Sequence, residues 1–270
     1  MAARTPSGRR VGAVRPELAD LLRPTGVLPQ SAGSVAEARE LLARDGAVVV
    51  AEPGPGPEAL PVVAAQVYGD RLRQLFAVRP LRQQAGELLG LHSDGAYVVV
   101  DVHGRTVSLR DPDEDGLLQR CVRPAPEGGD SFLVDGYALV DALATGCPEL
   151  HAFLTGTDVD YFGGWQTAPH EVPRTPLVRR LVEHTRAGRR VVRASETAVP
   201  VPREPCAAEH EAHLDLWADV LATAVDVVPH FRLEAGEVLV VDNYRCLHGR
   251  DPFTGQRDVD VLTVLTADAW

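Results

Sequence analysis

The motif His-x-Asp, which can chelate a metal ion when its backbone is extended, occurs twice in this chain. The two instances are His92–Asp94 and His213–Asp215. In an extended segment, residues two apart point to the same side, roughly 7 Å from each other along the strand. In a helix they lie about 200° apart and cannot bind one ion. The first instance precedes a segment of predicted strands and the second lies inside a predicted helix, so the first is the candidate metal site.

A third ligand must come from elsewhere, because one histidine and one carboxylate leave a first-row metal under-coordinated. Two histidines and one carboxylate on one face, with open positions, are typical of non-haem Fe(II) oxygenases. His248 is the candidate, since it follows a buried apolar run and a polar turn that carries the chain's only asparagine. If His248 is not the ligand, His103 or His230 is the alternative. The predicted ligands are thus His92, Asp94 and His248.

The elements that must position these side chains are short strands flanked by helices. Capping signals and helical spacing of apolar residues predict helices at 34–44, 58–75, 137–144 and 207–225. Apolar runs and turn residues predict strands at 47–51, 97–102, 106–110, 117–123, 131–134, 237–241 and 259–265. The three strands from 97 to 123 are expected to form one antiparallel sheet. Without a regular βαβ alternation, the pattern disfavours a Rossmann fold and favours an α+β fold with a double-sheet β core covered by helices.

The chain is expected to form a single domain over residues 1–270. We find no internal repeat, and the densest Pro/Gly stretch, 52–57, is too short for an interdomain linker. Residues 1–15 show no periodicity and are expected to be loose. Residues 155–205 are rich in proline and are expected to form an irregular, lid-like segment.

Composition excludes several classes of function. With 27 Lys+Arg against 38 Asp+Glu and a net charge of −11, the chain has no electrostatic reason to bind nucleic acid or anionic lipid. No apolar run approaches the roughly 18 residues that span a bilayer, and the N-terminus lacks the apolar stretch of a signal peptide. The four cysteines include no C-x-x-C pair. We therefore expect a cytoplasmic protein with reduced thiols and no nucleic-acid or membrane partner; homo-oligomer formation is left open.

Three segments resemble, in order and spacing, the Fe(II)/2-oxoglutarate dioxygenases of the taurine dioxygenase, γ-butyrobetaine hydroxylase and clavaminate synthase group. They are Leu91–Tyr97, Cys121–Gly136 and Asp242–Arg250, the last followed by Phe253 and Arg257. A weaker likeness over Leu41–Val50 suits the family's N-terminal helix and strand. The resemblance covers most of the chain from about residue 35 and is loosest over 150–230. It implies a double-stranded β-helix (jelly-roll) core flanked by helices.

The resemblance also implies a ligand set and a co-substrate site. It assigns Fe(II) to His92, Asp94 and His248. The co-substrate 2-oxoglutarate binds the metal at its keto-acid end and an arginine at its far carboxylate, and Arg257 is the matching residue. Strand alternation places Arg257 on the face of Val259 and Val261, where an arginine needs an anion, and its guanidinium fork suits a carboxylate. The alternative for Arg257 is a surface arginine. Ser131 matches a hydroxyl that touches the same carboxylate; the alternative is a plain turn serine.

The substrate side of the predicted pocket departs from the family. A second arginine, often found four residues after the co-substrate arginine, is here Val261. We therefore predict that Val261 forms an apolar wall and that the substrate is neutral or cationic on that side, because a desolvated anion without a partner is costly. A substrate carboxylate would instead be held by Arg110 or Arg250; a structural ion pair is the alternative for Arg250. The intact Asp94 argues against a halogenase, in which halide takes the carboxylate position.

The predicted function is oxygenation with Fe(II), O2 and 2-oxoglutarate, in which the co-substrate is oxidatively decarboxylated to succinate and CO2. The substrate, expected to be a small metabolite of bacterial specialised (natural-product) metabolism, is hydroxylated, desaturated or cyclised; this expectation rests on analogy. One alternative is a jelly-roll module that binds a metal and a small molecule without turnover. Another is a zinc hydrolase, which would need a general base that the sequence does not single out.

Overall fold

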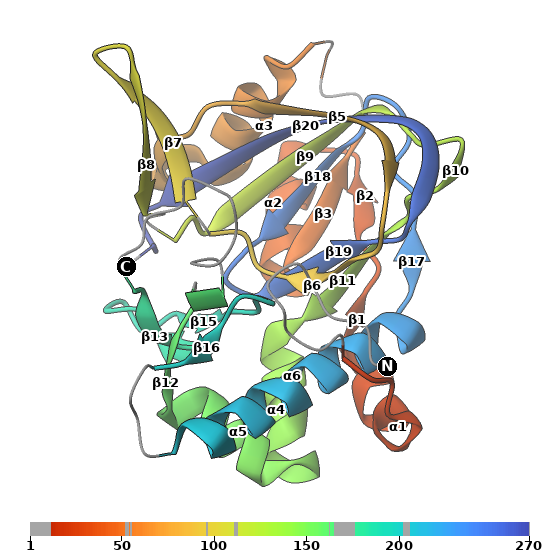
Figure 1. The fold of residues 1–270 in the computed structure, drawn as a ribbon. Helices are drawn as coiled ribbons and strands as arrows, with labels where there is room; N and C mark the ends of the chain where they lie inside the picture. Colours follow the sequence, from red (N-terminus) through yellow and green to blue (C-terminus); the bar gives the residue numbers. More distant parts are fainter. Residues whose placement is uncertain are drawn as a thin grey trace.

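Two large sheets with helices on their outer sides make up the fold (Figure 1). The computed structural model describes residues 12–51, 54, 56–95, 97–110, 113–161, 163–164, 176–201 and 206–269, without the side chains of 97–102 and 105–110. The expectation that the N-terminal residues are loose falls largely on residues 1–11, outside the described part. Among the described helices, none is both long and apolar enough to cross a bilayer.

The smaller of the two large sheets is antiparallel and has the order β1-β11-β19-β6, with β17 beside β11. Its strands are β1 (Gly26–Val27), β6 (Leu89–His92), β11 (Ser131–Asp135), β17 (His230–Phe231) and β19 (Cys246–Arg250). Both histidines of the predicted metal site lie on this sheet, on adjacent strands. The sequence did not predict β6 or β19 as strands, because each is short and carries polar residues.

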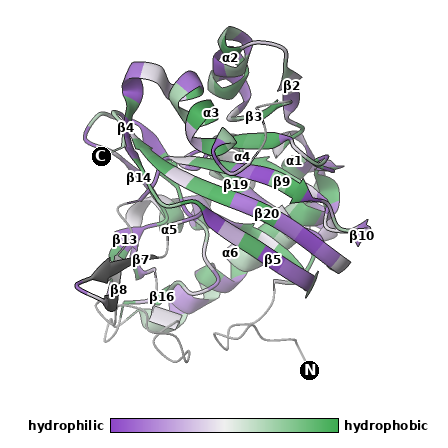
Figure 2. Ribbon diagram, turned by 90° about the horizontal axis from the view of Figure 1, so that it is seen from above, coloured by the Kyte–Doolittle hydropathy of each residue, from purple (hydrophilic) through white to green (hydrophobic). Residues whose placement is uncertain are grey.

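The larger sheet has the order β10-β20-β9-β18-β3-β2, with β4 and β5 also paired to the long strand β20. Its strands are β2 (Gln30–Ala32), β3 (Ala47–Val50), β4 (Leu72–Leu75), β5 (Arg79–Gly86), β9 (Gly116–Arg123), β10 (Glu127–Gly128), β18 (Val238–Asp242) and β20 (Phe253–Thr266). Only β2 and β3 pair in parallel. In Figure 2 the edge strand β5 is mainly hydrophilic, in contrast to the apolar strands in the middle of the sheet.

The remaining strands form three small sheets. They are β12 (Asp158–Asp160), β13 (Val178–Arg180) and β16 (Val199–Pro200) in one, β14 (Val182–His184) and β15 (Arg190–Val192) in another, and the hairpin β7 (Tyr97–Val102) and β8 (Arg105–Arg110). Two expectations are corrected here. The described part of 155–205 contains five short strands, and β7–β8 stands as its own sheet while β9 pairs with β18 and β20. Local alternation predicts a strand but not its partner, so the single three-stranded sheet was wrong.

Helices cover the outer faces of both sheets (Figure 1). They are α1 (Ala19–Leu22), α2 (Val35–Asp45), α3 (Ala59–Tyr68), α4 (Gly136–Gly146), α5 (Pro148–Gly156) and α6 (Ala207–Val227), with short 3-10 turns η1 (Pro16–Leu18), η2 (Arg23–Thr25) and η3 (Gly69–Arg71). The capping signal of α2 is confirmed, because the Ser34 hydroxyl accepts a hydrogen bond from the Glu37 amide at 3.2 Å. The expected helix over 58–75 is too long: α3 ends at Tyr68, and the chain continues through η3 into β4.

Alternation along β20 separates two apolar clusters. Val259 and Val261 join the cluster between the two large sheets, together with Leu133 and Leu239. Leu262 belongs to the cluster beneath α2 and α3. A strand buried on both faces in this way fixes its register, because a shift by one residue would exchange the two faces. This register determines which side chains of β20 and its neighbour β5 face the inside of the fold.

Candidate metal centre

His92 and His248 are brought together by strand pairing. In the antiparallel pair β6–β19, His92 lies directly opposite His248, and directly opposite residues point to the same face. Their ring centroids are 4.3 Å apart. Asp94 follows β6 by two residues, and its Oδ1 atom lies 3.7 Å from His92 Nε2 and 3.8 Å from His248 Nε2. The candidate ligand atoms of the three residues lie within 4.8 Å of one another, which suits a single ion.

The chemistry of these donors fits a divalent transition metal. Both ring nitrogens of His248 are buried and have no hydrogen-bond partner among the described residues. A buried polar group without a partner is costly, and Nε2, the nitrogen that lies beside Asp94, is the one that a metal ion in this centre would satisfy. His92 places Nδ1 2.9 Å from the Gly90 carbonyl oxygen, which accepts from it and leaves Nε2 directed at Asp94. Two imidazoles and one carboxylate with open positions form the donor set of non-haem Fe(II) sites.

The protonation states at the centre also favour metal binding. Burial lowers the pKa of His92 to about 4, and the charge of His248 acts in the same direction. His92 is therefore neutral near pH 7, as a metal ligand must be. Burial alone would raise the pKa of Asp94, but the close approach and charge of His248, with the charges of His92 and Arg79, hold it below its usual range. Asp94 is consequently ionised.

Asn243 holds the backbone at Asp94. The Asp94 amide donates to Asn243 Oδ1 at 3.0 Å, and Asn243 Nδ2 donates to the Asp94 carbonyl at 3.0 Å. The same Nδ2 donates to the Glu114 carbonyl at 2.7 Å, and the Asn243 side chain is buried. The asparagine thus joins the metal-ligand loop to the turn before β19. The sequence marked this residue only as part of a polar turn, because its partners are distant in the chain.

The neighbouring residue Ser93 is held from the opposite side. Its amide donates to the Ala194 carbonyl at 3.1 Å, and its hydroxyl lies 2.9 Å from the buried Tyr161 hydroxyl. Ala194 and Tyr161 both belong to the segment expected to be lid-like. That segment therefore packs directly against the loop carrying the candidate ligands.

Arg250 and Arg257 lie at the other end of the same interior. Their guanidinium carbons are 4.5 and 5.8 Å from the Phe253 ring centroid, respectively. Arg250 donates to two backbone carbonyls, those of Asp251 at 2.6 Å and Glu87 at 3.0 Å. Among the described residues, no carboxylate lies within ion-pair distance of either guanidinium. Ser131 is opposite Arg250 in the β11–β19 pair and is buried.

The electrostatics of this arginine pair favour an anion. Burial lowers the pKa of Arg250 and of Arg257, and the charge of Arg250 lowers the pKa of Arg257 further. An anion between them would offset both effects.

The other described residues that the sequence singled out are not among the three candidate ligands. His103 is an exposed turn residue of the β7–β8 hairpin, and His230 binds Asp251 at 2.7 Å. His213 lies in α6, as expected. Arg110 ends β8, and its side chain lies outside the described part. Val261 is 4% exposed, buried in the cluster between the sheets.

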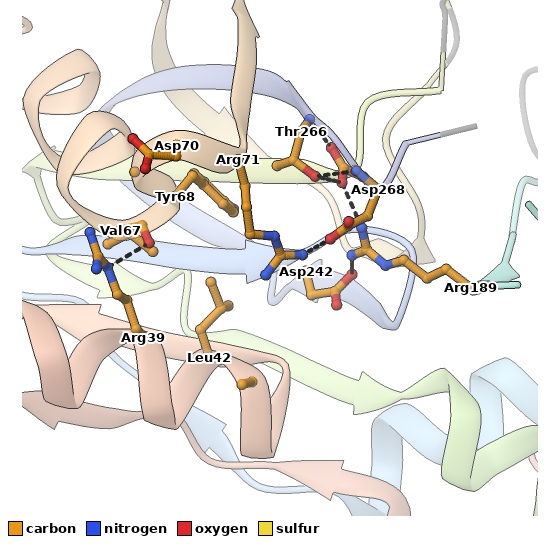
Figure 3. A pocket seen from close by; sticks show the side chains of 13 residues that line it. Arg39, Leu42, Val67, Tyr68, Asp70, Arg71, Arg189, Asp242, Thr266 and Asp268 are labelled. Carbon is orange, nitrogen blue, oxygen red and sulfur yellow. Dashed lines mark hydrogen bonds and ion pairs between the residues drawn. The ribbon is translucent and has the colours of Figure 1, made fainter. Parts of the chain in front are cut away.

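A separate cavity of about 590 Å3 opens between α2, the end of α3 and the end of β20, and none of the three candidate ligands lines it (Figure 3). Its charged groups largely neutralise one another. Arg189 binds Asp115 at 2.5 Å and Asp242 at 2.6 Å, and Arg71 is paired with Asp268. The Tyr68 hydroxyl in its lining is buried without a hydrogen-bond partner among the described residues, but the paired carboxylates and arginines leave this cavity without the metal-ligand cluster found at the metal centre.

Comparison with known proteins agrees with this geometry. The sequence model described as "Taurine catabolism dioxygenase TauD, TfdA family" matches residues 18–265. The chain belongs to this family. Members of the TauD/TfdA family are Fe(II)/2-oxoglutarate-dependent oxygenases, so the resemblance noted from the sequence and the enzyme class are confirmed. Fe(II), 2-oxoglutarate and O2 are the cofactor and co-substrates that fit the family.

Solved structures similar to this TauD/TfdA-family chain share its fold at low sequence identity. A taurine dioxygenase from Burkholderia xenovorans is 23% identical, with a TM-score of 0.60, over 87% of this chain and 81% of that one. AAD-2 in complex with Mn(II) and N-oxalylglycine is 16% identical, with a TM-score of 0.59, over 91% and 90%. Asparagine oxygenase with Fe(II), 2S,3S-3-hydroxyasparagine and succinate is 17% identical, with a TM-score of 0.53, over 95% and 93%.

Proposed function

We propose that this oxygenase holds Fe(II) through His92, Asp94 and His248 and oxidises a small metabolite by hydroxylation, desaturation or cyclisation. The observation that carries the proposal is the convergence of these three residues, with the buried His248 Nε2 left without a hydrogen-bond partner among the described residues. We further propose that the two large sheets form a double-stranded β-helix. The pairing of β6 with β19, which joins distant parts of the chain, supports this interpretation.

The protein's own groups have distinct parts in the proposed mechanism. Bound Fe(II) would supply the redox chemistry that couples O2 to decarboxylation of the keto acid. His92, Asp94 and His248 would hold the ion, and a set of three protein ligands would leave positions for co-substrate and substrate. Arg257 orients 2-oxoglutarate by binding its far carboxylate, and Ser131 donates a hydrogen bond to the same group. Val259 and its apolar neighbours exclude water, which strengthens these contacts.

Two observations weigh against the alternative functions. A binding module without turnover has no specific need for the buried Arg250 and the half-buried Arg257, which lack a carboxylate partner among the described residues. A zinc hydrolase needs a general base beside the ion. The described cluster contains no fourth histidine, cysteine or carboxylate to act as one.

The function is tested by succinate formation from 2-oxoglutarate in the presence of Fe(II), O2 and ascorbate. We expect the wild type to form succinate, and His248→Ala to lose turnover together with most of its Fe(II) affinity. His103→Ala is the matched control, since it removes an exposed imidazole at the β7–β8 turn. If His248→Ala kept normal iron content and substantial turnover, the third ligand would be misassigned.

The wider role is also a proposal. We infer a single domain that acts in the cytoplasm on a small molecule, without nucleic acid or membrane as a partner. A role in bacterial specialised metabolism is supported by likeness to PvcB, described as an Fe, alpha-ketoglutarate dependent oxygenase from an isonitrile synthetic pathway, at 17% identity and a TM-score of 0.55 over 98% of this chain and 93% of that one. Size-exclusion chromatography would show whether it forms a homo-oligomer.

A further inference from the structure

The edge strand β5 places a row of side chains beside the inward face of β20. The register pairs Arg79 with Val261 and Gln83 with Arg257. Directly paired residues of antiparallel strands share a face, and Val261 belongs to the apolar cluster between the sheets. Arg79 and Gln83 therefore lie on the inner face. Strand β5 lies at the edge of the sheet, next to β20 (Figure 1).

Arg82, on the same strand, lies on the opposite face. Its guanidinium binds Asp260 at 2.5 Å and the Val259 carbonyl at 2.7 Å. It is thus held by a close carboxylate on the outer side of the sheet. Arg79 and Arg82 therefore belong to the same strand but lie on opposite faces of the sheet.

Arg79 reaches the metal centre but is held only loosely there. Its Nη2 atom lies 3.9 Å from Asp94 Oδ2. Among the described residues, Asp94 is the carboxylate with which Arg79 forms an ion pair. The side chain is 54% exposed, so it retains access to solvent. Leu81, which follows on the same inner face opposite Val259, is also exposed. This side of the interior is consequently open next to the candidate metal ligands.

Metal binding would leave Arg79 without a full counter-charge, because a divalent ion would attract the Asp94 carboxylate. A solvent-accessible guanidinium fork suits a carboxylate. We propose that Arg79 binds an anionic group of the substrate, and that the substrate is a small carboxylate-bearing molecule. The inference rests on the proposed function. It revises the expectation drawn from Val261: β20 lacks a cation at this position, and the neighbouring strand supplies one.

The position of Arg79 also limits where the substrate is oxidised. Arg79 pairs with residue 261 and the co-substrate arginine is residue 257, so four residues, or about 13 Å of strand, separate the two anion sites. Arg79 instead lies beside Asp94, whose other carboxylate oxygen is within 3.8 Å of both histidines. The oxidised carbon is therefore only a few bonds from the anionic group.

Binding measurements on the loaded enzyme test the proposal. The protein carries Mn(II) and N-oxalylglycine, and calorimetry measures the affinity for L-amino acids and short aliphatic carboxylic acids, each beside its primary amide. Succinate release with Fe(II) and 2-oxoglutarate is measured in parallel for the same compounds. The variants are Arg79→Gln and Arg79→Lys, with Arg82→Gln as the matched control on the outer face.

We expect at least one acid to bind better than its amide. Arg79→Gln should weaken binding of that acid by about tenfold to a hundredfold and leave the amide unchanged, because one charged hydrogen-bond partner is lost. Arg79→Lys should restore part of the affinity, and Arg82→Gln should change neither ligand. The affinity for Mn(II) should change far less than that for the acid.

Several results would overturn the inference. One is that no acid of the panel binds better than its amide; another is that Arg79→Gln weakens acid and amide equally, or only in step with Mn(II). The latter would mean that Arg79 serves solely to orient Asp94. Failure of the proposed function is distinguishable, since the wild type would then show neither Mn(II)-dependent binding of N-oxalylglycine nor succinate formation.

Discussion

Arginines are used differently in two regions of this molecule. At the acidic loop 113–115, Arg189 binds two carboxylates, and Arg193 binds Asp113 at 2.9 Å and Glu183 at 2.6 Å. At the far end of the metal-site interior, Arg250 and Arg257 share the ring of Phe253 and have no carboxylate partner among the described residues. Both pairs are largely removed from water, yet only the first is neutralised by the protein itself.

The pKa directions follow this difference. Burial would lower the pKa of Arg189 and Arg193, but their carboxylate partners raise it above the usual range. For Arg250 and Arg257, burial prevails and the pKa is lowered. A guanidinium that the fold has already paired stabilises the fold. One that the fold has left unpaired is available to a ligand, which is why the second pair is assigned to the co-substrate.

The largest expected effect comes from breaking the neutralised pair. Arg193→Ala should lower the free energy of unfolding by up to about 3 to 5 kcal/mol, because it removes the guanidinium that binds the buried Asp113 at 2.9 Å and leaves that carboxylate to Arg179, which is 3.6 Å away. Urea unfolding of the metal-free protein measures this loss. Arg44→Ala removes an ion pair of similar length, with Asp45, at the surface and should change stability little. Equal losses in both variants would contradict the structural role assigned to Arg193.

Removing an unpaired arginine should affect ligand binding instead. Arg257→Ala should raise the 2-oxoglutarate requirement by roughly tenfold to a hundredfold, since a charged hydrogen bond is worth about 1.5 to 3 kcal/mol. Stability should hardly fall, because the variant also removes the repulsion by Arg250. Steady-state kinetics and N-oxalylglycine binding measure the first effect, and urea unfolding the second. A large loss of stability with unchanged co-substrate dependence would place Arg257 with the structural arginines.

A third substitution tests how the acidic loop supports the metal centre. Asn243→Ala removes the bridge between the Asp94 backbone and the Glu114 carbonyl, leaving buried groups unpaired at a cost of about 1 to 3 kcal/mol. We expect weaker Fe(II) affinity even where the variant is fully folded. Calorimetric titration with Fe(II) under anaerobic conditions measures it, with Ser131→Ala as a control that lies at the co-substrate end. Unchanged metal affinity would limit Asn243 to a role in stability.

The local parts of this arrangement could be predicted from the sequence, and so could one long-range part, the meeting of His92 and Asp94 with His248, because a family resemblance linked those motifs. Alternation and caps predicted α2 and β3 and the helical setting of His213, because those signals lie within a few residues of each other. The role of Asn243 and the inward position of Arg79 depend on pairings across more than a hundred residues, which no local pattern encodes. Val261 illustrates this limit of local patterns: the sequence predicted that Val261 faces inward, but it did not predict that Arg79 lies opposite Val261 on the neighbouring strand.

The smallest expected effect concerns His230, which binds the carboxylate of Asp251, the residue next to Arg250. The adjacent Asp251 is 2.7 Å from His230 Nδ1, so its carboxylate is already engaged. Burial would lower the pKa of His230, but the Val225 carbonyl and Asp251 raise it. A raised pKa means that the contact stabilises the fold fully below the unfolded-state pKa and loses this contribution as pH rises through the folded-state pKa. His230→Gln should therefore destabilise the protein most at mildly acidic pH, by less than about 1 kcal/mol at this partly exposed pair.

Urea unfolding of both proteins from pH 5.5 to 8.5, roughly spanning the ordinary histidine range, measures the difference. A difference that grew with pH would show that His230 does not bind Asp251 as a cation. If Asp251 then turned to Arg250, N-oxalylglycine would bind more weakly to the variant, and the contrast between the two pairs of arginines would depend on this one histidine.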